Sequence, residues 1–330
     1  MLGPGPAALP PCPRPQPLNI DTSRIAEAAA SATLGQHHPA GALYVVATPI
    51  GNLADITLRA VAVLALVDAV ACEDTRVTGQ LLRHLGLDKP LLALHQHIES
   101  SAAQAVLARL ALGQRVAYAS DAGTPAISDP GALLVDAVAR AGHRVMPIPG
   151  ASSVVTALSA AGDGLAQGFH FVGFLPGKGQ DRRSALQATA AAPGCQLLFE
   201  APHRIEALLT GLCEAAPARR ITLCRELTKQ FETIVTLVAA DAPVWLAADA
   251  NRCRGEFVVV LHALPAPARA DDAALPAEAE RLLLPLLREL PLKQAVALAA
   301  ELSGAPRNAL YQRALQLKRG APDEAEAGPG

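Results

Sequence analysis

The chain has 330 residues, of which 51% are hydrophobic and 3% aromatic, and its 28 lysines and arginines nearly balance 30 aspartates and glutamates. The formal net charge of -2 argues against a strongly basic nucleic-acid binder, although a local basic face is compatible with it. This length is enough for two compact domains with ordinary cores.

The cysteines and histidines do not suggest a metal site. The 6 cysteines contain no Cys-x-x-Cys pair, and the 9 histidines form no His-Glu-x-x-His array. We therefore expect no metal, and reduced thiols of the kind found in cytoplasmic proteins. The sequence has no secretory signal and no apolar run of about 20 residues, so we expect a soluble protein that does not span a membrane.

The first half of the chain predicts an α/β domain. Residues 1–40 are rich in Pro, Ala and Gly, and we expect them to be disordered apart from a marginal helix near 24–33. From residue 41, apolar runs at 43–47, 69–72, 91–94, 116–119 and 145–148 alternate with helical periodicity. This alternation is typical of a parallel sheet covered on both faces, and we assign it to residues 41–165.

The second half predicts another α/β domain and a helical end. We expect strands at 169–175, 196–199, 221–224, 234–238 and 257–262, with helices at 182–192 and 203–215, in a domain over residues 166–264. Residues 275–319 are expected to be helical, and 292–302, a Ser-Gly-Ala-Pro turn and 307–317 resemble a helix-turn-helix. The alternative is a plain helical cap packed on the second domain. Residues 320–330 are expected to be a disordered tail.

The loop after the fourth expected strand, residues 120–131, has the composition of a binding loop. In parallel α/β sheets, ligands bind outside the carboxyl ends of the strands. Prolines stiffen this loop and glycines let a ligand approach its backbone closely. We expect Asp121 to contact the ligand and Asp129 to cap the helix that begins near Pro130. An ordinary strand–helix connection is the alternative.

The turn after the first strand limits which ligand this can be. It contains Pro49, Gly51 and Asn52, and neither the dinucleotide fingerprint nor a phosphate-binding P-loop occurs there. We therefore expect a ligand other than a pyrophosphate. At the end of the second strand, Glu73 and Asp74 precede Arg76, and helix capping and chemistry are both open for this cluster.

Six motifs in order resemble one family. They are Leu43-Tyr44-Val45-Val46-Ala47-Thr48-Pro49-Ile50-Gly51-Asn52-Leu53, Glu73-Asp74-Thr75-Arg76, the loop 120–131, Gly173-Phe174-Leu175-Pro176, Glu200-Ala201-Pro202-His203-Arg204 and Arg225-Glu226-Leu227-Thr228-Lys229. Over residues 42–263 the chain resembles the ribosomal RNA small subunit methyltransferase I family. That resemblance implies two α/β domains of tetrapyrrole-methylase type (class III methyltransferase) with a small C-terminal helical segment.

The resemblance also implies an activity and partners. S-adenosylmethionine would donate a methyl group to the 2'-hydroxyl of a cytidine ribose in the decoding region of 16S rRNA, within the 30S subunit. A homodimer is implied, with the cofactor between the two α/β domains of a protomer, and neither DNA nor a membrane is an expected partner. The chain departs from the family at Ile98, where the family tends to have asparagine, and at Asp163, where it tends to have leucine.

Candidate site residues follow from matching motif to motif. The resemblance places Asp121, Gly123 and Thr124 at the cofactor, followed by the serines after the fifth strand and the glycine before the last strand, which are Ser152, Ser153 and Gly255. Simple N-capping is the alternative for both serines.

For the chemistry, a weakly acidic ribose hydroxyl needs a base or a nearby cation. Our hypothesis is that Glu73 or Glu226 accepts the proton while Arg225 or Lys229 holds the phosphate.

Basic residues at turns are candidates for RNA contact, namely Lys178, Arg182, Arg183, His203, Arg204, Arg252 and Arg254, and so are Arg307, Arg313, Lys318 and Arg319 of the last helix. Each cluster could equally be a solvated face. Two other functions stay open at this point. One is a methylase of the same fold that acts on a tetrapyrrole or another small molecule, and the other is a non-catalytic RNA-binding ribosome assembly factor.

Overall fold

The computed structural model describes the chain except for residues 1–21, 95–98, 129–130, 266–274, 276 and 320–330. By contacts it divides into two units, residues 1–263 and 264–330, and each is described by itself. Among the described residues, no helix combines the length and the apolar composition that crossing a membrane requires.

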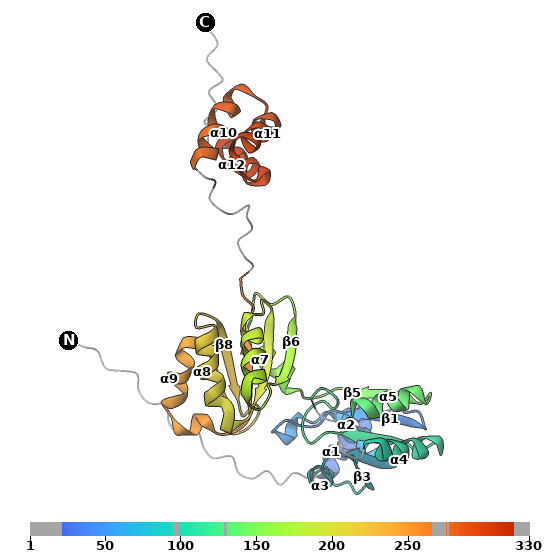
Figure 1. Cartoon of the computed structure of the whole chain (residues 1–330). Coiled ribbons are helices and arrows are strands. Elements are labelled where there is room, and N and C mark those ends of the chain that lie inside the picture. Colours follow the sequence, from blue (N-terminus) through green and yellow to red (C-terminus); the bar gives the residue numbers. More distant parts are fainter. Residues whose placement is uncertain (1–21, 95–98, 129–130, 266–274, 276, 320–330) are drawn as a thin grey trace, which may run out of the picture. The chain divides into compact units, whose positions relative to one another are not determined.

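The first unit begins with a parallel five-stranded sheet in the order β3-β2-β4-β1-β5 (Figure 1). Its strands are β1 (Ala42–Val46), β2 (Ala69–Cys72), β3 (Leu91–Ala93), β4 (Val116–Ala119) and β5 (Arg144–Ile148). Its helices are α1 (Thr22–Ala32), α2 (Leu58–Leu66), α3 (Thr75–His84), α4 (Glu99–Ala111) and α5 (Ala132–Arg140), with a 3-10 turn at Leu53–Asp55. All five strands confirm the periodicity of the sequence.

Side chains alternate between the two faces of this sheet. Tyr44 and Val46 pack with Leu64 of α2 and Leu82 of α3, whereas Leu43 packs on the other face with residues of α4 and α5. Successive side chains of a strand point to opposite faces, so both faces are apolar and both are covered. The binding loops are therefore left at the carboxyl ends of the strands.

The short helix expected near residues 24–33 is confirmed, and it is anchored rather than marginal. Residues 22–32 form α1, Ala29 is 1% exposed, and Ile25 packs against the same apolar cluster as α2. A short helix that is marginal alone is stabilised here by burying its apolar side. Residues 1–21 lie outside the described residues.

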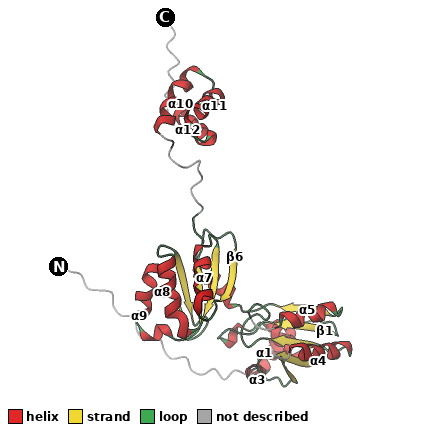
Figure 2. Cartoon of the chain, viewed as in Figure 1, coloured by secondary structure: helices red, strands yellow, loops and turns green. Residues whose placement is uncertain are grey.

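The second sheet has the order β6-β7-β10-β8-β9. Its strands are the yellow arrows beside α7 and α8 in Figure 2. Its strands are β6 (Phe169–Phe174), β7 (Cys195–Glu200), β8 (Arg220–Arg225), β9 (Thr233–Val238) and β10 (Phe257–Leu261). Only β6 and β7 pair in parallel, and the other neighbours are antiparallel. Helices α7 (Gly179–Ala191), α8 (Ile205–Ala215) and α9 (Ala242–Ala247) belong to this part, with 3-10 turns at Pro202–Arg204, Ala239–Asp241 and Ala250–Cys253.

Helix α6 (Ser153–Ala161), which follows β5, covers the face of the second sheet opposite to α7 and α8. Val154 and Ala157 of α6 share one apolar cluster with Leu197 of β7 and Val260 of β10. Strand β10 is consequently buried along its whole length. This shared core fixes the carboxyl ends of the first sheet beside the second sheet, and the candidate site forms there.

The second unit is a three-helix body of α10 (Ala277–Glu289), α11 (Leu292–Ser303) and α12 (Arg307–Arg319). Its own core includes Leu283, Val296 and Leu310. Gly304 ends α11 in the left-handed conformation with φ 67°, which glycine adopts without steric cost. The predicted helix, turn and helix over 292–317 are confirmed.

Candidate functional site

The loops that follow β1 and β4 are tied together by their backbones. The Thr48 N–H donates to the Gly123 carbonyl at 2.9 Å, and the Gly123 N–H donates to the Thr48 carbonyl at 3.1 Å. Gly123 has φ 83°, and a Cβ there would lie 3.2 Å from Cγ2 of Ile50. Since both backbone groups of Gly123 are engaged, its part at the site is to allow a close approach.

Four predicted cofactor residues come together around a small pocket of about 60 Å³. Gly123, Thr124, Ser152 and Ser153 all line it, with Ala122, Ile127, Ser128, Val154 and Phe199. The hydroxyl of Thr124 donates to the Ala151 carbonyl at 3.0 Å and thereby connects the two loops. The tertiary structure thus gathers residues from two loops that are about 30 positions apart in the chain.

The two serines after β5 are placed at the start of α6. Ser152 occupies the N-cap position with extended backbone, but its side chain makes no capping hydrogen bond. The capping alternative therefore does not describe its hydroxyl. In the loop 120–131, Asp129 and Pro130 lie outside the described residues, and α5 begins at Ala132 with Gly131 at its N-cap.

Asp121 and Gly255 lie elsewhere than the other cofactor candidates. Asp121 accepts a hydrogen bond from the Asp74 N–H at 3.1 Å, which joins the loops after β2 and β4. Gly255 lies in the second domain with φ 89°, and a Cβ there would be 2.5 Å from Cγ of Glu226. Asp121 and Gly255 each have a clear local role, and neither residue lines the small pocket.

A larger cleft of about 400 Å³ lies between the two α/β domains. It is lined from the first domain by Ile50, Ala122, Ser128 and Ser153, and from the second by Phe174, Phe199, Glu200, Ala201, Pro202, Cys224, Leu227, Glu256, Phe257 and Val258. Ala122, Ser128, Ser153 and Phe199 line both hollows, so the small pocket opens into the cleft. A mostly apolar cleft with a few polar groups is typical of a binding site for an organic molecule.

Backbone strain is concentrated in two of the predicted loops. Among the described non-glycine residues, the positive-φ ones are Ala126 at 64°, Glu226 at 51° and Thr228 at 66°. Such conformations cost free energy and persist where the surrounding structure holds them, often at functional sites. Ala126 lies in the loop after β4, and the other two lie in the turn after β8.

That turn holds a compact group of charges. Nζ of Lys229 lies 2.9 Å from Oε1 of Glu226 and 2.9 Å from Oε2 of Glu256. A Cβ on Gly51 would come within 2.5 Å of Cγ of Lys229, so the glycine lets the lysine pass beside the loop after β1. Lys229 does not itself line the cleft, but its ammonium contacts Glu256, which does.

The charges in this turn shift each other's protonation. Burial by itself raises the pKa of Glu226, but the Glu256 N–H and the Lys229 ammonium outweigh it and lower that pKa overall. Burial lowers the pKa of Lys229, but its two carboxylate partners raise it overall. Glu226 is therefore a weaker base than an ordinary glutamate, and Lys229 is a firmly held cation.

Arg225 does not offer its guanidinium as predicted. The residue is 9% exposed, and Nε donates to the Arg254 carbonyl at 2.6 Å while Nη1 donates to the Phe231 carbonyl at 3.0 Å. A guanidinium that is used in this way holds the turn in place. Of the two cations in the hypothesis, Lys229 is the more exposed, with 28% of its side chain accessible, and its ammonium also pairs with two carboxylates.

At the end of β2, Asp74 caps α3 by accepting from the Arg76 N–H at 2.8 Å, and it forms an ion pair with the Arg76 guanidinium at 2.6 Å. These hydrogen bonds hold the pKa of Asp74 well below its usual range. The capping interpretation therefore describes Asp74. Glu73 is half-buried beside it and does not line the cleft.

Comparisons with known proteins agree with this arrangement. The family model of the tetrapyrrole (corrin/porphyrin) methylases matches residues 42–243. Ribosomal RNA small subunit methyltransferase I of Escherichia coli O157:H7 is 47% identical over 277 residues, which cover 84% of this chain and 95% of that protein. Its namesake from Pseudomonas aeruginosa is 48% identical over 278 residues, covering 84% and 98%. The chain belongs to the ribosomal RNA small subunit methyltransferase I family.

The fold class expected for this family is confirmed. The solved structure of the cobalamin biosynthetic enzyme cobalt precorrin-4 methyltransferase superimposes with a TM-score of 0.51 at 18% identity, covering 67% of this chain and 94% of that one. At that identity the likeness concerns the fold alone. A second model, the RsmI C-terminal HTH domain, matches residues 273–318, which is where α10, α11 and α12 lie.

The ion pairs of Glu200, which lines the cleft, were not predicted from the sequence. Glu200 is fully buried, and its carboxylate lies 2.6 Å from Nη2 of Arg182 and 2.8 Å from Nε of Arg204. The motif at residues 200–204 was visible in the sequence, and its i,i+4 spacing allowed the pair with Arg204. Nothing local indicated the partner 18 positions upstream.

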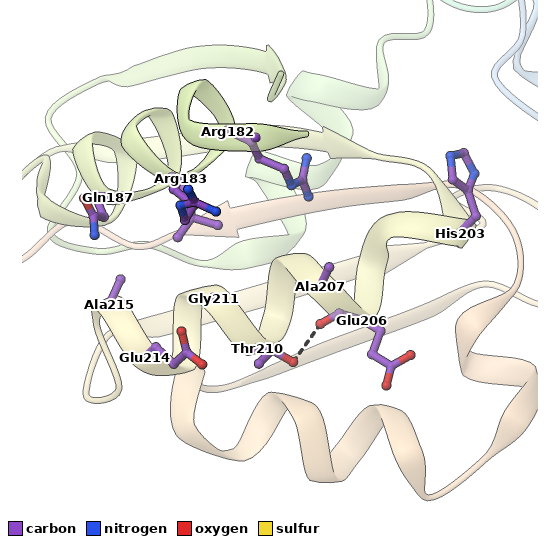
Figure 3. A pocket seen from close by; sticks show the side chains of 12 residues that line it. Arg182, Arg183, Gln187, His203, Glu206, Ala207, Thr210, Gly211, Glu214 and Ala215 are labelled. Atoms are coloured by element: carbon purple, nitrogen blue, oxygen red, sulfur yellow. Dashed lines mark hydrogen bonds between the residues drawn. The ribbon is translucent and has the colours of Figure 1, made fainter. Parts of the chain in front are cut away.

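A groove of about 720 Å³ lies between α7 and α8, and none of the predicted cofactor or catalytic residues lines it, although the predicted RNA-contact residues Arg182, Arg183 and His203 do (Figure 3). Figure 3 shows Arg182, Arg183 and Gln187 along one wall and Glu206, Thr210 and Glu214 along the other. It is the larger hollow, but its walls carry both signs of charge and it lacks the loops at the carboxyl ends of the first sheet. The cleft is therefore the better candidate for the active site of this methyltransferase family member.

Proposed function

We propose that this protein transfers a methyl group from S-adenosylmethionine to the 2'-hydroxyl of a cytidine ribose in the decoding region of 16S rRNA, within the 30S subunit. The observation that carries the proposal is the identity of 47% with a ribosomal RNA small subunit methyltransferase I along 84% of the chain. At 277 residues the match is long enough to include most of both α/β domains.

The cleft and the small pocket suit S-adenosylmethionine in size and chemistry. The cleft has about 400 Å³, which is within the usual range for small-molecule sites. Apolar side chains such as Phe257 and Val258 can cover an adenine ring, and the hydroxyls of Ser128 and Ser153 can serve a ribose or an amino acid group. When bound, the cofactor supplies an electrophilic methyl group on a sulfonium.

The residues of the chain have separate tasks in this proposal. Thr124, Ser152 and Ser153 orient the donor, because they line one pocket beside the cleft. Lys229 holds a phosphate of the RNA or stabilises the developing alkoxide, since one of the two carboxylates that fix its ammonium lines the cleft. Glu73, in the loop after β2, is our preferred proton acceptor, because Glu226 is committed to its ion pair with Lys229.

Methyl transfer to purified 30S subunits tests the function. We expect label from methyl-labelled S-adenosylmethionine to appear on 16S rRNA, at a cytidine that resists alkaline cleavage because its 2'-oxygen is methylated. Label on free rRNA alone would show that intact 30S is not the substrate. Binding of the cofactor without any transfer, or no binding by calorimetry, would favour a non-catalytic assembly factor.

The proton acceptor is tested by Glu73→Gln and Glu226→Gln in the same assay. We expect Glu73→Gln to lower kcat by about a hundredfold, the lower end of what general base catalysis contributes. Glu226→Gln should act through Lys229 and raise KM more than it lowers kcat. Full activity in both variants would remove both residues from the chemistry.

A tetrapyrrole or other small-molecule methylase is the second candidate, because the family model that matches residues 42–243 is described by tetrapyrrole substrates. The helical unit at 277–319 favours RNA, since a small-molecule enzyme has less need of it. Incubation with a free porphyrinogen in place of 30S subunits separates the two, and transfer to the porphyrinogen alone would reverse our preference.

The partners in this proposal are 16S rRNA in the 30S subunit and a second copy of the chain. A cytoplasmic location follows from that substrate, because 30S subunits are assembled there. The homodimer is a prediction from the family, and light scattering of the purified protein tests it. A mass equal to one chain at micromolar concentration would contradict it.

A further inference from the structure

A phenylalanine that lines the cleft from the second sheet lies beside an arginine. Phe174, the last residue of β6, is 53% exposed and lines the cleft. The guanidinium carbon of Arg204 lies 5.7 Å from the centroid of its ring, within the range of a cation–π interaction. Phe199 meets the same ring edge-on, with 5.6 Å between centroids. Of the exposed phenylalanines, Phe174 is the one that lines the cleft.

The buried carboxylate of Glu200 holds this pair in place. Burying a charge is costly unless it is paired, and Glu200 is paired on both sides. One partner, Arg204, is the residue that lies over Phe174, and the Ala201 N–H also donates to Oε1 of Glu200 at 2.9 Å. The ion pair therefore restricts Arg204 to the position in which its plane can cover the ring.

All phenylalanines of the chain lie in the second domain, at positions 169, 171, 174, 199, 231 and 257. Phe171, Phe174 and Phe199 form one continuous aromatic contact, with 4.9 Å between the centroids of the first and last. Sequence-specific RNA binding commonly places an unstacked base on an aromatic ring or an arginine plane. A nucleotide whose base leaves its stack to enter a cleft needs a new stacking partner.

We propose that Phe174, with Arg204 held by Glu200, is the stacking platform for the base of the nucleotide that is methylated. The proposal rests on the proposed function and names a substrate-positioning element for it. The base would lie against the exposed part of the Phe174 ring, at the end of the cleft formed by the second sheet. Arg204 and Glu200 would act through Phe174 as positioning residues.

Phe174→Leu tests the platform, with Phe174→Tyr as the conservative variant. With 30S subunits as substrate, we expect Phe174→Leu to lower kcat/KM about tenfold or more, mainly through KM, which corresponds to the loss of one stacked base. Phe174→Tyr should retain most of the activity. Phe169→Leu is the matched control, because Phe169 begins the same strand, is 47% exposed and does not line the cleft.

A measurement of cofactor affinity shows whether the adenine of the cofactor or the base of the nucleotide lies on Phe174. Calorimetry with S-adenosylmethionine alone should give the same Kd, within about twofold, for the wild type and Phe174→Leu. An equal loss of cofactor affinity and of kcat/KM would assign the ring to the adenine of the cofactor and overturn the proposal. Unchanged kcat/KM in Phe174→Leu, with an active wild type, would overturn it as well and leave the proposed function intact.

A binding assay keeps the platform testable without turnover. A single-stranded RNA oligonucleotide with 2-aminopurine at its centre should lose fluorescence on binding the wild type, since stacking quenches this base. The quenching should be smaller with Phe174→Leu, and intermediate with Arg204→Gln, which removes the cation from the ring. Equal quenching by the wild type and Phe174→Leu would overturn the proposal even if the protein does not methylate 30S subunits.

Discussion

The carboxylate of Asp121 accepts a hydrogen bond from the backbone N–H of Asp74 at 3.1 Å. The bond joins the loop after β4 to the first turn of α3, which Asp74 caps. Asp121 was predicted as a ligand contact, and the structure gives it a partner within the protein. Substitutions can separate these two roles.

We expect Asp121→Ala to weaken cofactor binding and to lower the free energy of unfolding by about 1 kcal/mol, the usual value of one hydrogen bond. Asp121→Asn keeps an oxygen that can accept from the Asp74 N–H, so it should retain stability and still bind the cofactor less tightly. Calorimetry and urea unfolding measure the two effects. Wild-type cofactor affinity in Asp121→Asn would reduce Asp121 to a structural residue.

Gly255 should tolerate no side chain. With φ 89° and a Cβ that would lie 2.5 Å from Cγ of Glu226, Gly255→Ala forces that side chain away from Lys229. We expect a loss of about 2 kcal/mol in the free energy of unfolding, from backbone strain and overpacking together. Urea unfolding measures it.

Gly164→Ala is the control for that substitution, because no atom lies within 4 Å of its Cβ position and its φ is not in the left-handed range. It should be neutral or slightly stabilising. If both glycine variants lost the same stability, the close contact with Glu226 would not be the cause.

The Lys229→Gln variant should lose mainly activity, whereas the Arg225→Gln variant should lose mainly stability. Lys229→Gln should lower kcat/KM on 30S subunits about tenfold or more and change the free energy of unfolding by less than about 1 kcal/mol, because its side chain is partly exposed. Arg225→Gln should instead cost about 1–3 kcal/mol of stability, since two carbonyls lose their donor. Steady-state kinetics and urea unfolding of both variants test the contrast, and the reverse pattern would contradict the assignment.

His262 should make the protein less stable toward acid. Burial lowers the pKa of His262 below that of an ordinary histidine, and the nearby arginines add to this against the opposing effect of Asp163. Between the folded and unfolded pKa values the unfolded chain binds more protons, so the stabilisation is complete above about pH 6.5 and decreases as the pH falls toward the folded pKa. Urea unfolding between pH 8 and pH 5 measures this decrease.

The comparison variant is His262→Gln, which cannot titrate but can still hydrogen-bond with the Thr222 hydroxyl, 2.7 Å from Nε2 in the wild type. The wild type should lose stability on acidification more steeply than this variant. A gentler loss in the wild type would mean that Asp163, 3.8 Å from Nδ1, raises the folded pKa instead.

The sequence alone predicted the strands and most of the helices, and it placed the candidate cofactor residues at the ends of strands. Apolar runs such as 43–47 and 116–119 have the length of buried strands, and the helical periodicity between them requires a parallel sheet with loops at its carboxyl ends. Thr124 and Ser153 could be placed in those loops because strand ends are readable locally. The same local pattern did not reveal that α1 is anchored, because its stability comes from burying Ile25 and Ala29 against α2.

Only the tertiary structure decided which charges are available. Arg225 and Lys229 are four positions apart in one motif, yet one guanidinium is buried on carbonyls and one ammonium pairs with a carboxylate that lines the cleft. Glu200 and Arg182 become partners only because β7 and α7 fold side by side. Residue type and spacing determine secondary structure through local sterics and periodicity, whereas burial, pairing and pKa depend on neighbours that are distant in the chain.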